Sequence, residues 1–419
     1  MPCACFGGIA SLPERRRPAW SAARRTNDMK RRIAVLGSTG SVGVQALSLI
    51  ADRQDRFELV LLGARRSAAA LLDQARRFRP GAVCLAEGNG REASLAADCA
   101  WFEGAGGLLD ALEQTQPELV LNAITGAAGL PASEWTLRTG RTLALANKES
   151  LVVAGAHLRA LAASTGARIL PVDSEHCAIA QCLHGERLDR VRRIWLTASG
   201  GPFRERPLAD FASITPAEAL RHPTWDMGPR ITIGSATMMN KAFEVLEAHW
   251  LFGLEPERIA VVVHPQSIVH SMVEFVDGSL VAQLGVPDMR VPILYCLGWP
   301  DRLPFEGFSP FDPLRFARLG FEPIDERRFP AIPLAYEVLA RGGDSGATLN
   351  AADEVATAAF LAGRIAFPAI TELVTQVLRA TEPGPVRSLD DAHRADRAAR
   401  AAAELRLAGA ARAGAQRVP

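Results

Sequence analysis

The stretch Arg32-Ile-Ala-Val-Leu-Gly37-Ser-Thr-Gly40-Ser-Val-Gly43 decides the fold class of this chain. Residues 32–36 form a short apolar run that ends at a glycine, which is typical of a buried parallel strand. The glycines then lead into a helical pattern over residues 41–51. A strand, a tight glycine turn and a helix start together present free backbone N–H groups to a pyrophosphate. We therefore predict a dinucleotide site here; the alternative is a plain tight turn between strand and helix.

The alternation of strand and helix continues to about residue 172. Apolar runs that predict strands alternate with helical patterns such as residues 68–78. This order indicates a doubly wound α/β domain, a Rossmann-like unit with a parallel sheet. The predicted strands cover residues 32–36, 57–63, 82–85, 119–123, 142–146 and 168–172.

The residues after the second predicted strand indicate which dinucleotide is bound. An NAD site places an acidic residue there to hold the ribose 2′-hydroxyl. This chain instead has Arg65, Arg66 and Ser67. Two guanidiniums and a hydroxyl suit a 2′-phosphate, so NADPH is favoured over NADH. The alternative is a pair of solvated arginines at a helix start.

The pattern changes after residue 172. Apolar runs at residues 193–197, 258–264, 270–275 and 279–284 predict a mixed sheet, with a hairpin turn at residues 277–278. A helix is expected over residues 236–251, and the Ala-, Leu- and Arg-rich remainder is helical. We therefore expect an extension at 1–29, a dinucleotide domain at 30–172, an α+β catalytic domain at 173–305, a linker at 306–333 and a C-terminal helical bundle at 334–419.

Two acidic segments suggest a metal site. Asp173 and Glu175 follow an apolar run, and on an extended chain residues two apart point the same way. Glu244 shares a helix face with Asn240 and Lys241. Three converging carboxylates form a hard oxygen site for Mg²⁺ or Mn²⁺. Taken singly, each acid reads as a solvated or salt-bridged surface carboxylate.

Several other segments carry groups suited to a phosphorylated substrate. Lys148 follows a predicted strand, at the edge where open α/β sheets bind ligands. Ser199 lies in a glycine turn, and Ser235 is expected to cap the helix that carries Glu244. The irregular segment 221–230 resembles a lid, in which His222 would bind phosphate and Trp225 would exclude water. The alternatives are a surface lysine, a structural cap and a packed loop.

Composition limits the classes of protein. The chain has 419 residues and a formal net charge of +1, so no nucleic-acid or membrane partner is expected. Seven scattered cysteines favour a reducing compartment, and a bacterial cytoplasm is the expected location. The first 28 residues are rich in arginine, as organellar transit peptides are; a disordered extension, or a start at Met29, is the simpler account.

Several long segments of the chain together resemble one family, 1-deoxy-D-xylulose 5-phosphate reductoisomerase. They are GSTGSVG at 37–43, ANKESLV at 146–152, LPVDSEH at 170–176, SGGPFRE at 199–205, SATMMNKAFE at 235–244, HPQSIVHSMVEF at 264–275, VPDMR at 286–290 and LNAADE at 349–354. The resemblance spans nearly everything after residue 30. Cys177 and Gly234 depart from the family pattern, which often has Asn and Asp there.

The resemblance implies NADPH- and metal-dependent rearrangement and reduction of 1-deoxy-D-xylulose 5-phosphate by a homodimer, with Mg²⁺, Mn²⁺ or Co²⁺. Asp173, Glu175 and Glu244 fall on the metal ligands, and Lys148, Glu175 and His222 would take part in catalysis. The substrate would contact Lys148, Ser174, Glu175, Ser199, His222, Trp225, Ser235, Asn240, Lys241 and Glu244. NADPH would contact Gly37, Thr39, Gly40, Ser41, Val42, Arg65, Arg66, Ser67, Asn147, Glu149 and Gly228.

Two other functions remain as alternatives. One is an NADPH-dependent reductase of a phosphorylated aldehyde that carries out no rearrangement. The other is a non-enzymatic NADPH-sensing or scaffolding protein, for which damage to the acidic residues or to Lys148 would be expected, and these residues are intact.

Overall fold

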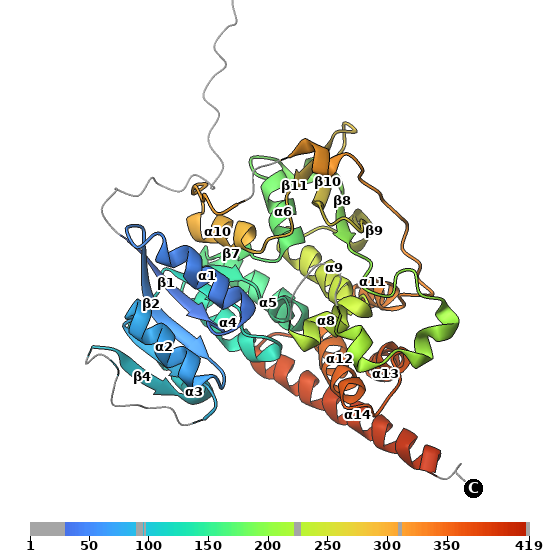
Figure 1. Cartoon of the computed structure of the whole chain (residues 1–419). Coiled ribbons are helices and arrows are strands. Elements are labelled where there is room, and N and C mark those ends of the chain that lie inside the picture. The colour runs from blue at the N-terminus through green and yellow to red at the C-terminus, as the bar shows by residue number, and fades with distance from the viewer. Residues whose placement is uncertain (1–29, 89–94, 96–97, 222–227, 309–311, 416–419) are drawn as a thin grey trace, which may run out of the picture.

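The structure is a computed structural model that describes residues 30–415 apart from 89–94, 96–97, 222–227 and 309–311. The structure has three parts: a parallel sheet with helices on both faces, a smaller sheet, and a group of C-terminal helices (Figure 1). This arrangement confirms the predicted fold class. No helix among the described residues is long and apolar enough to cross a membrane.

The first sheet is parallel throughout, as its apolar strands predict. Its order is β4-β3-β2-β1-β5-β6-β7. The predicted strands are confirmed to within a few residues, whereas β4 was missed because it is a short edge strand that is only partly buried. The strands are β1 Arg31–Leu36, β2 Phe57–Ala64, β3 Ala82–Leu85, β4 Ala100–Glu103, β5 Leu119–Asn122, β6 Thr142–Leu145 and β7 Arg168–Pro171.

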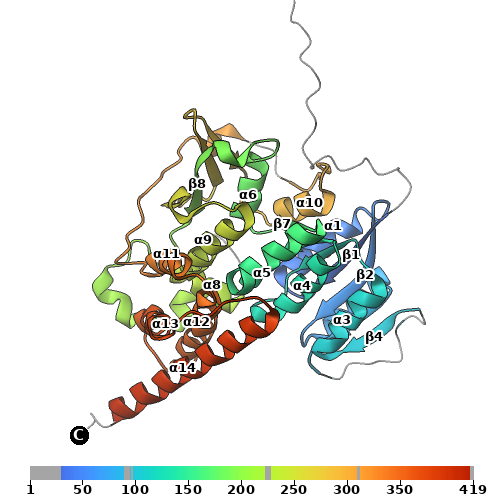
Figure 2. The ribbon, with the colours of Figure 1, turned by 180° about the vertical axis from the view of Figure 1, so that it is seen from behind.

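Helices cover both faces of this sheet (Figures 1 and 2). On one face lie α1, Ser41–Ala51, and α2, Ala68–Phe78, together with α10, Arg290–Gly298, although α10 falls in the segment assigned by sequence to the second domain. Apolar residues of α10, such as Ile293, share a core with Ile33 and Val35 of β1. The other face carries α3, Gly104–Thr115, α4, Leu130–Arg138, and α5, Glu149–Thr165.

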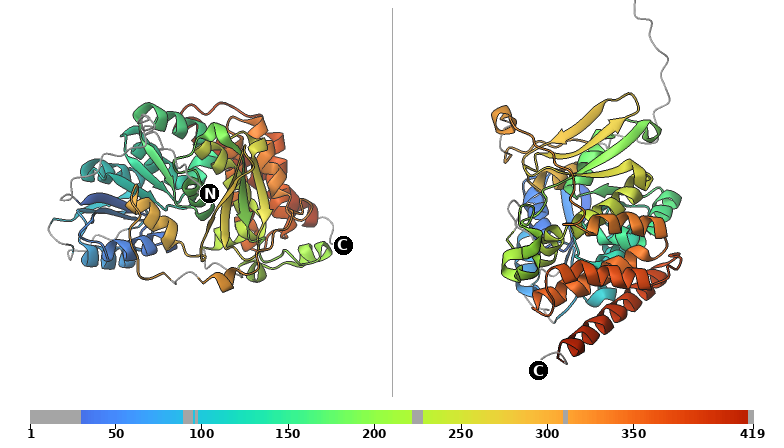
Figure 3. Two further views of the ribbon diagram at one scale, coloured as in Figure 1. Left: turned by 90° about the horizontal axis from the view of Figure 1, so that it is seen from above. Right: turned by 90° about the vertical axis from the view of Figure 1, so that its right-hand side faces the viewer.

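The second sheet is mixed, as predicted, with the order β11-β10-β8-β9 (Figure 3). Strands β8 and β9 are parallel and the other pairs are antiparallel. The predicted turn joins β10 to β11: Gly278 has φ 87° and the Ser279 N–H donates to Asp277 Oδ1 at 2.9 Å. The strands are β8 Val191–Ala198, β9 Ile259–Val263, β10 Val269–Phe275 and β11 Leu280–Leu284.

The predicted helix over residues 236–251 is wrong at its start. The chain forms α8, Pro229–Ala236, and then α9, Met239–Phe252. Met238 between them adopts a left-handed φ of 61°, which ends one helix before the next begins. Ser235 therefore lies in the last turn of α8 and is not the N-cap of α9.

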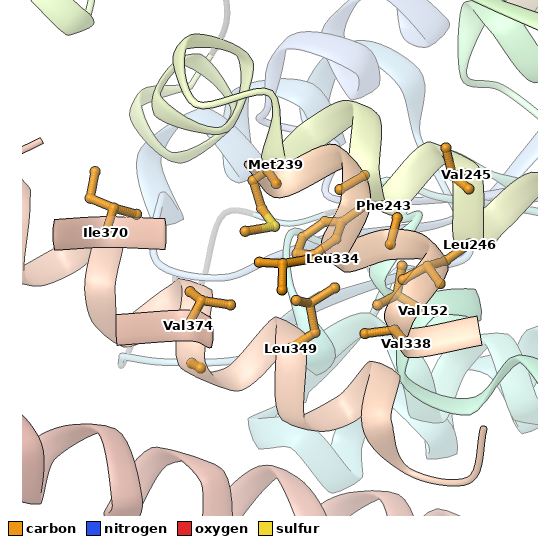
Figure 4. Close-up of a cluster of buried hydrophobic side chains, with 14 of the residues drawn as sticks. Val152, Met239, Phe243, Val245, Leu246, Leu334, Val338, Leu349, Ile370 and Val374 are labelled. Carbon is orange, nitrogen blue, oxygen red and sulfur yellow. The ribbon is translucent and has the colours of Figure 1, made fainter. Parts of the chain in front are cut away.

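The C-terminal helices pack on α9 and α5 around one apolar core. Figure 4 shows Phe243 of α9 among side chains of α5, α11, α12 and α13. Helix α12 is buried along most of its length. The helices are α11 Ala331–Arg341, α12 Ser345–Leu361, α13 Pro368–Ala380 and the long α14 Leu389–Ala415. The described residues between α10 and α11 form only a 3-10 turn, Pro313–Phe316, and a bridge of Val263 to Glu322.

Candidate active site

A cavity of about 480 Å³ lies between the first sheet, the second sheet and helices α8 and α9. It brings together nine of the predicted substrate and metal residues, which come from four separate segments of the chain. These residues are Lys148, Asp173, Ser174, Glu175, Ser199, Ser235, Asn240, Lys241 and Glu244. The clustering follows from topology, since β6 and β7 end at the same edge of the parallel sheet.

Asp173 and Glu175 do not lie on an extended chain, so that part of the prediction is wrong. Strand β7 ends at Pro171, and helix α6, Ser174–Cys182, begins directly after Asp173. Asp173 is its N-cap, and its Oδ1 accepts the Ser174 N–H at 3.0 Å. Glu175 lies in the first turn, so the helix start and not a strand pleat directs both carboxylates into the cavity.

Two lysines bind the three carboxylates. Lys148 Nζ lies 2.5 Å from Asp173 Oδ2 and 3.2 Å from Glu244 Oε1. Lys241 Nζ lies 2.6 Å from Glu175 Oε1 and also contacts Glu244 Oε2. The chain has 47 Lys and Arg residues, yet its only lysines are Lys30, Lys148 and Lys241. Two of the three lysines of the chain therefore lie at this site, where each places a compact ammonium between carboxylates.

His176 and Glu247 extend the acidic cluster into the protein interior. His176 is fully buried, with Nε2 2.9 Å from the Glu244 carbonyl oxygen and Nδ1 3.3 Å from Glu247 Oε2. The sequence analysis did not name Glu247. The available signal was the spacing of Glu244 and Glu247, because residues three apart share a helix face.

A second cavity of about 220 Å³ adjoins the first and shares Ser41, Val42, Lys148 and Asn240 with it. Several predicted cofactor residues line this second cavity: Gly37, Gly40, Ser41, Val42, Asn147, Glu149 and Gly228. Thr39 belongs to the same turn but does not line the cavity. Asn147 and Glu149 have partners within the protein. Asn147 Nδ2 donates to the Gly126 carbonyl at 2.9 Å, and Glu149 Oε1 lies 3.1 Å from Arg230 Nη1.

The glycine loop has the tight geometry that the motif predicts. Gly37 has φ 77°, and a Cβ there would lie 2.5 Å from the Ala123 carbonyl oxygen. A Cβ on Gly43 would lie 2.3 Å from the Gly37 carbonyl oxygen. Helix α1 begins after Gly40 without a side-chain cap, so its first N–H groups face the adjoining cavity.

Arg65, Arg66 and Ser67 follow β2 directly and are exposed. They do not line either cavity. Both guanidiniums bind the carboxylate of Glu87, a residue that the sequence analysis did not consider. His222 and Trp225 lie outside the described residues, with the rest of residues 222–227. The predicted irregular segment 221–230 is wrong at its end, because Pro229 and Arg230 begin helix α8.

The comparisons with known proteins identify the family. Models of 1-deoxy-D-xylulose 5-phosphate reductoisomerase and of its C-terminal domains match residues 33–155, 169–252 and 284–402. A relative of that name from Anaeromyxobacter dehalogenans is 50% identical over 390 residues, which cover 92% of this chain and 100% of the relative. The chain belongs to the 1-deoxy-D-xylulose 5-phosphate reductoisomerase family.

Solved reductoisomerase structures share the whole fold. The Zymomonas mobilis reductoisomerase in complex with NADPH matches with a TM-score of 0.84 at 41% identity, covering 90% of this chain and 99% of that chain. A reductoisomerase in complex with NADPH, fosmidomycin and magnesium also matches with a TM-score of 0.84, at 35% identity and 90% and 98% coverage.

The acidic cluster of this reductoisomerase family member fits a divalent cation. One ligand atom each of Asp173, His176 and Glu244 lie within 4.8 Å of one another. Burial would raise the pKa of Asp173, but attraction to Lys148 outweighs it and lowers the pKa to about 2. Burial lowers the pKa of His176 to about 4, so its ring is neutral, as a metal ligand must be.

The charged form of Glu244 is disfavoured in this arrangement. Burial, with repulsion from Glu175, raises its pKa to about 7. Burial also raises the pKa of Glu247 well above its usual range. These buried carboxylates are neutralised here by lysines and by raised pKa values. A doubly charged cation at this site would stabilise their charged forms.

Proposed function

We propose that this protein rearranges and reduces 1-deoxy-D-xylulose 5-phosphate to 2-C-methyl-D-erythritol 4-phosphate with NADPH and a divalent cation, in the non-mevalonate isoprenoid pathway. The observation that carries this proposal is the convergence of three carboxylates and two lysines beside a dinucleotide loop. Family membership and the NADPH and magnesium complexes of the related structures support it.

Asp173, Glu175 and Glu244 would hold the cation, with Mg²⁺ or Mn²⁺ expected and Co²⁺ as a further choice. His176 is a nitrogen donor at the same cluster. When bound, the cation supplies a Lewis acid for the substrate's ketone and hydroxyl oxygens, and NADPH supplies the hydride.

Lys148 would stabilise negative charge that develops on the substrate during the reaction. It lines both cavities, and its Nζ contacts Asp173 and Glu244. Attraction to these acids outweighs burial and raises the pKa of Lys148 well above its usual value, so it remains protonated. Its Nζ can therefore donate a hydrogen bond to a substrate oxygen that gains negative charge. Glu175, hydrogen-bonded to Lys241 and to the Ser174 hydroxyl, would relay a proton.

The substrate phosphate would bind in the same cavity. Ser199, Ser235, Asn240 and Lys241 line it, and the Gly201 N–H already donates to Ser199 Oγ at 3.3 Å. Binding energy from this remote group would serve the chemical step through positioning. His222 and Trp225 remain proposed as lid residues that contact the phosphate and exclude water.

Substitution of the acids tests the proposed function. Asp173→Asn and Glu244→Gln should each lose most of the turnover of 1-deoxy-D-xylulose 5-phosphate, measured as Mg²⁺-dependent loss of NADPH absorbance. NADPH binding should stay nearly unchanged, because both acids lie outside the glycine loop. Near-normal turnover by either variant would refute the metal assignment, and wild-type reduction of simple aldehydes without metal would favour the plain reductase.

We also propose a homodimer built on the second sheet. Strand β11 is an edge strand, and it and the adjoining turn expose apolar side chains that include Val276, Leu280 and Val281. A second copy of this face would cover them and pair the free edge. Val281→Lys should yield monomers in light scattering, whereas Val44→Lys, an exposed valine of α1, should leave the dimer intact.

We propose that the protein is located in a bacterial cytoplasm. All five cysteines in the described part of the chain are free, which is compatible with a reducing compartment. The Arg-rich residues 1–28, and with them the question of organellar import, lie outside the described residues.

A further inference from the structure

Glu87 occupies the position between the two guanidiniums assigned to the 2′-phosphate of NADPH. Its Oε1 accepts from Arg65 Nε and its Oε2 accepts from Arg66 Nε, both at 2.5 Å. Each carboxylate oxygen therefore takes one guanidinium, as two oxygens of a phosphate would.

The backbone fixes this acid beside the arginines. Strands β2 and β3 are parallel neighbours, and Arg65 and Glu87 each lie just beyond the end of their strand. The Glu87 N–H donates to the Arg65 carbonyl at 2.7 Å, and the Ala86 N–H donates to the Ala64 carbonyl at 2.9 Å. The Gly37 N–H donates to the Gly63 carbonyl at 2.8 Å, so the glycine loop is tied to the same strand end.

Stability does not explain this cluster. The side chains of Arg65, Arg66 and Glu87 are 66%, 69% and 41% exposed, and exposed ion pairs stabilise proteins little. Hydrogen bonds from Arg65 and Arg66 lower the pKa of Glu87, so the acid is charged at neutral pH. An incoming 2′-phosphate meets two positive charges that already hold one negative charge.

We propose that Glu87 is an internal counter-ion that competes with the 2′-phosphate for Arg65 and Arg66, and so limits the affinity for NADPH and the preference for NADPH over NADH. This inference rests on the proposed function, in which NADPH is the reductant. Each guanidinium has five N–H donors, and only Nε is used by Glu87, so a phosphate can displace the carboxylate or share the arginines with it. In either case the fixed negative charge opposes the phosphate.

Glu87→Gln tests the inference, because the amide keeps the shape of the side chain and removes its charge. NADPH should bind the variant about three- to tenfold more tightly than the wild type at low salt, as expected for one exposed unit charge a few ångströms away. NADH has no 2′-phosphate and should change less than about twofold by the same reasoning. Dissociation constants for both are measured by fluorescence titration of the full chain.

Two controls separate this effect from a general change of charge. Glu58→Gln removes the same charge at the opposite end of β2, about 20 Å away by strand geometry, where Glu58 lies 3.9 Å from Arg32. It should leave both affinities unchanged. In an Arg65→Ala, Arg66→Ala background, Glu87→Gln should tighten NADPH binding less than it does in the wild type, because Glu87 then has no guanidiniums to compete for and only its direct repulsion of the phosphate is removed.

The other outcomes overturn the inference in distinguishable ways. Weaker NADPH binding by Glu87→Gln would mean that the acid orients the arginines for the phosphate. An equal change for NADPH and NADH would mean that the acid does not act on the 2′-phosphate. A wild-type protein that binds no NADPH would overturn the proposed function as well, whereas the first two results leave it standing.

Discussion

Two clusters in this molecule pair acids with cations, one at the proposed metal site and one at the proposed site for the 2′-phosphate of NADPH, and they differ in their exposure to water. Lys148 and Lys241 hold the acids of the central cavity, where Glu244 is 1% exposed. Arg65 and Arg66 hold Glu87 at the surface. Burial makes unpaired charge expensive, while water screens exposed charge. The first cluster should therefore affect stability and chemistry together, and the second should affect only ligand affinity.

Removal of one buried lysine should produce the largest effect. Lys241→Met leaves Glu175 and Glu244 without their shared cation, and breaking a buried pair costs about 3–5 kcal/mol of unfolding free energy. The expected result is a large fall in melting temperature at pH 8, partly recovered by Mg²⁺, which would replace the lost positive charge.

Lys30→Met is a matched control for that prediction. Lys30 is the remaining lysine of the chain and is exposed, so the same substitution should change the melting temperature little. If Lys241→Met is as stable as Lys30→Met, with or without Mg²⁺, the buried cluster does not depend on its own cations and the comparison fails.

A smaller, pH-dependent effect on stability is expected from Asp353 of α12. This residue is 3% exposed, and Arg230 Nη2 lies 4.0 Å from Asp353 Oδ2. Burial raises its pKa from 3.8 to about 6. The unfolded chain therefore loses this proton at lower pH than the folded protein does. The folded state loses stability as pH rises from about 4 to about 6, by about 1–3 kcal/mol, and stays at that level above the window.

Comparison with Asp353→Asn isolates this effect, because the amide does not titrate. The wild-type melting temperature minus that of the variant should fall between pH 4 and 6 and be flat above. Asp277→Asn is a control of opposite sign, since hydrogen bonds from Ser279 lower the pKa of the exposed Asp277. A difference for Asp353→Asn that does not vary with pH would show that Arg230 compensates the charge fully.

The fold was predictable where the pattern is local. Short apolar runs predicted the strands of both sheets except β4, and the glycine loop predicted the strand–turn–helix unit at residues 31–51. The break between α8 and α9 was not predictable, because Met238 in a left-handed conformation has no sequence signal such as glycine would give. The position of α10 on the first sheet was also missed, because it depends on a long-range apolar contact and not on periodicity.

The candidate site was predictable in its members and only partly in its ion pairs. Asp173, Glu175 and Glu244 were named from local motifs, and the structure places them in one cavity. The pair of Lys241 and Glu244 is local to one helix face, whereas the contacts of Lys148 with Asp173 and Glu244, and of Lys241 with Glu175, depend on how distant segments meet. The same limit hid Glu87, since residues 65 and 87 become neighbours only when β2 and β3 pair.

The smallest effect is expected for the stability of the exposed cluster. Glu87→Gln removes both of the ion pairs with Arg65 and Arg66, yet these side chains are largely solvated. The melting temperature without nucleotide should change by about 1 °C or less, since exposed pairs contribute little. The same variant should gain melting temperature over the wild type when NADPH is added, because tighter binding stabilises the folded state. A large loss of stability without nucleotide would contradict this prediction: Glu87 would then hold the strand ends together, and the two clusters would not differ in the way that their burial indicates.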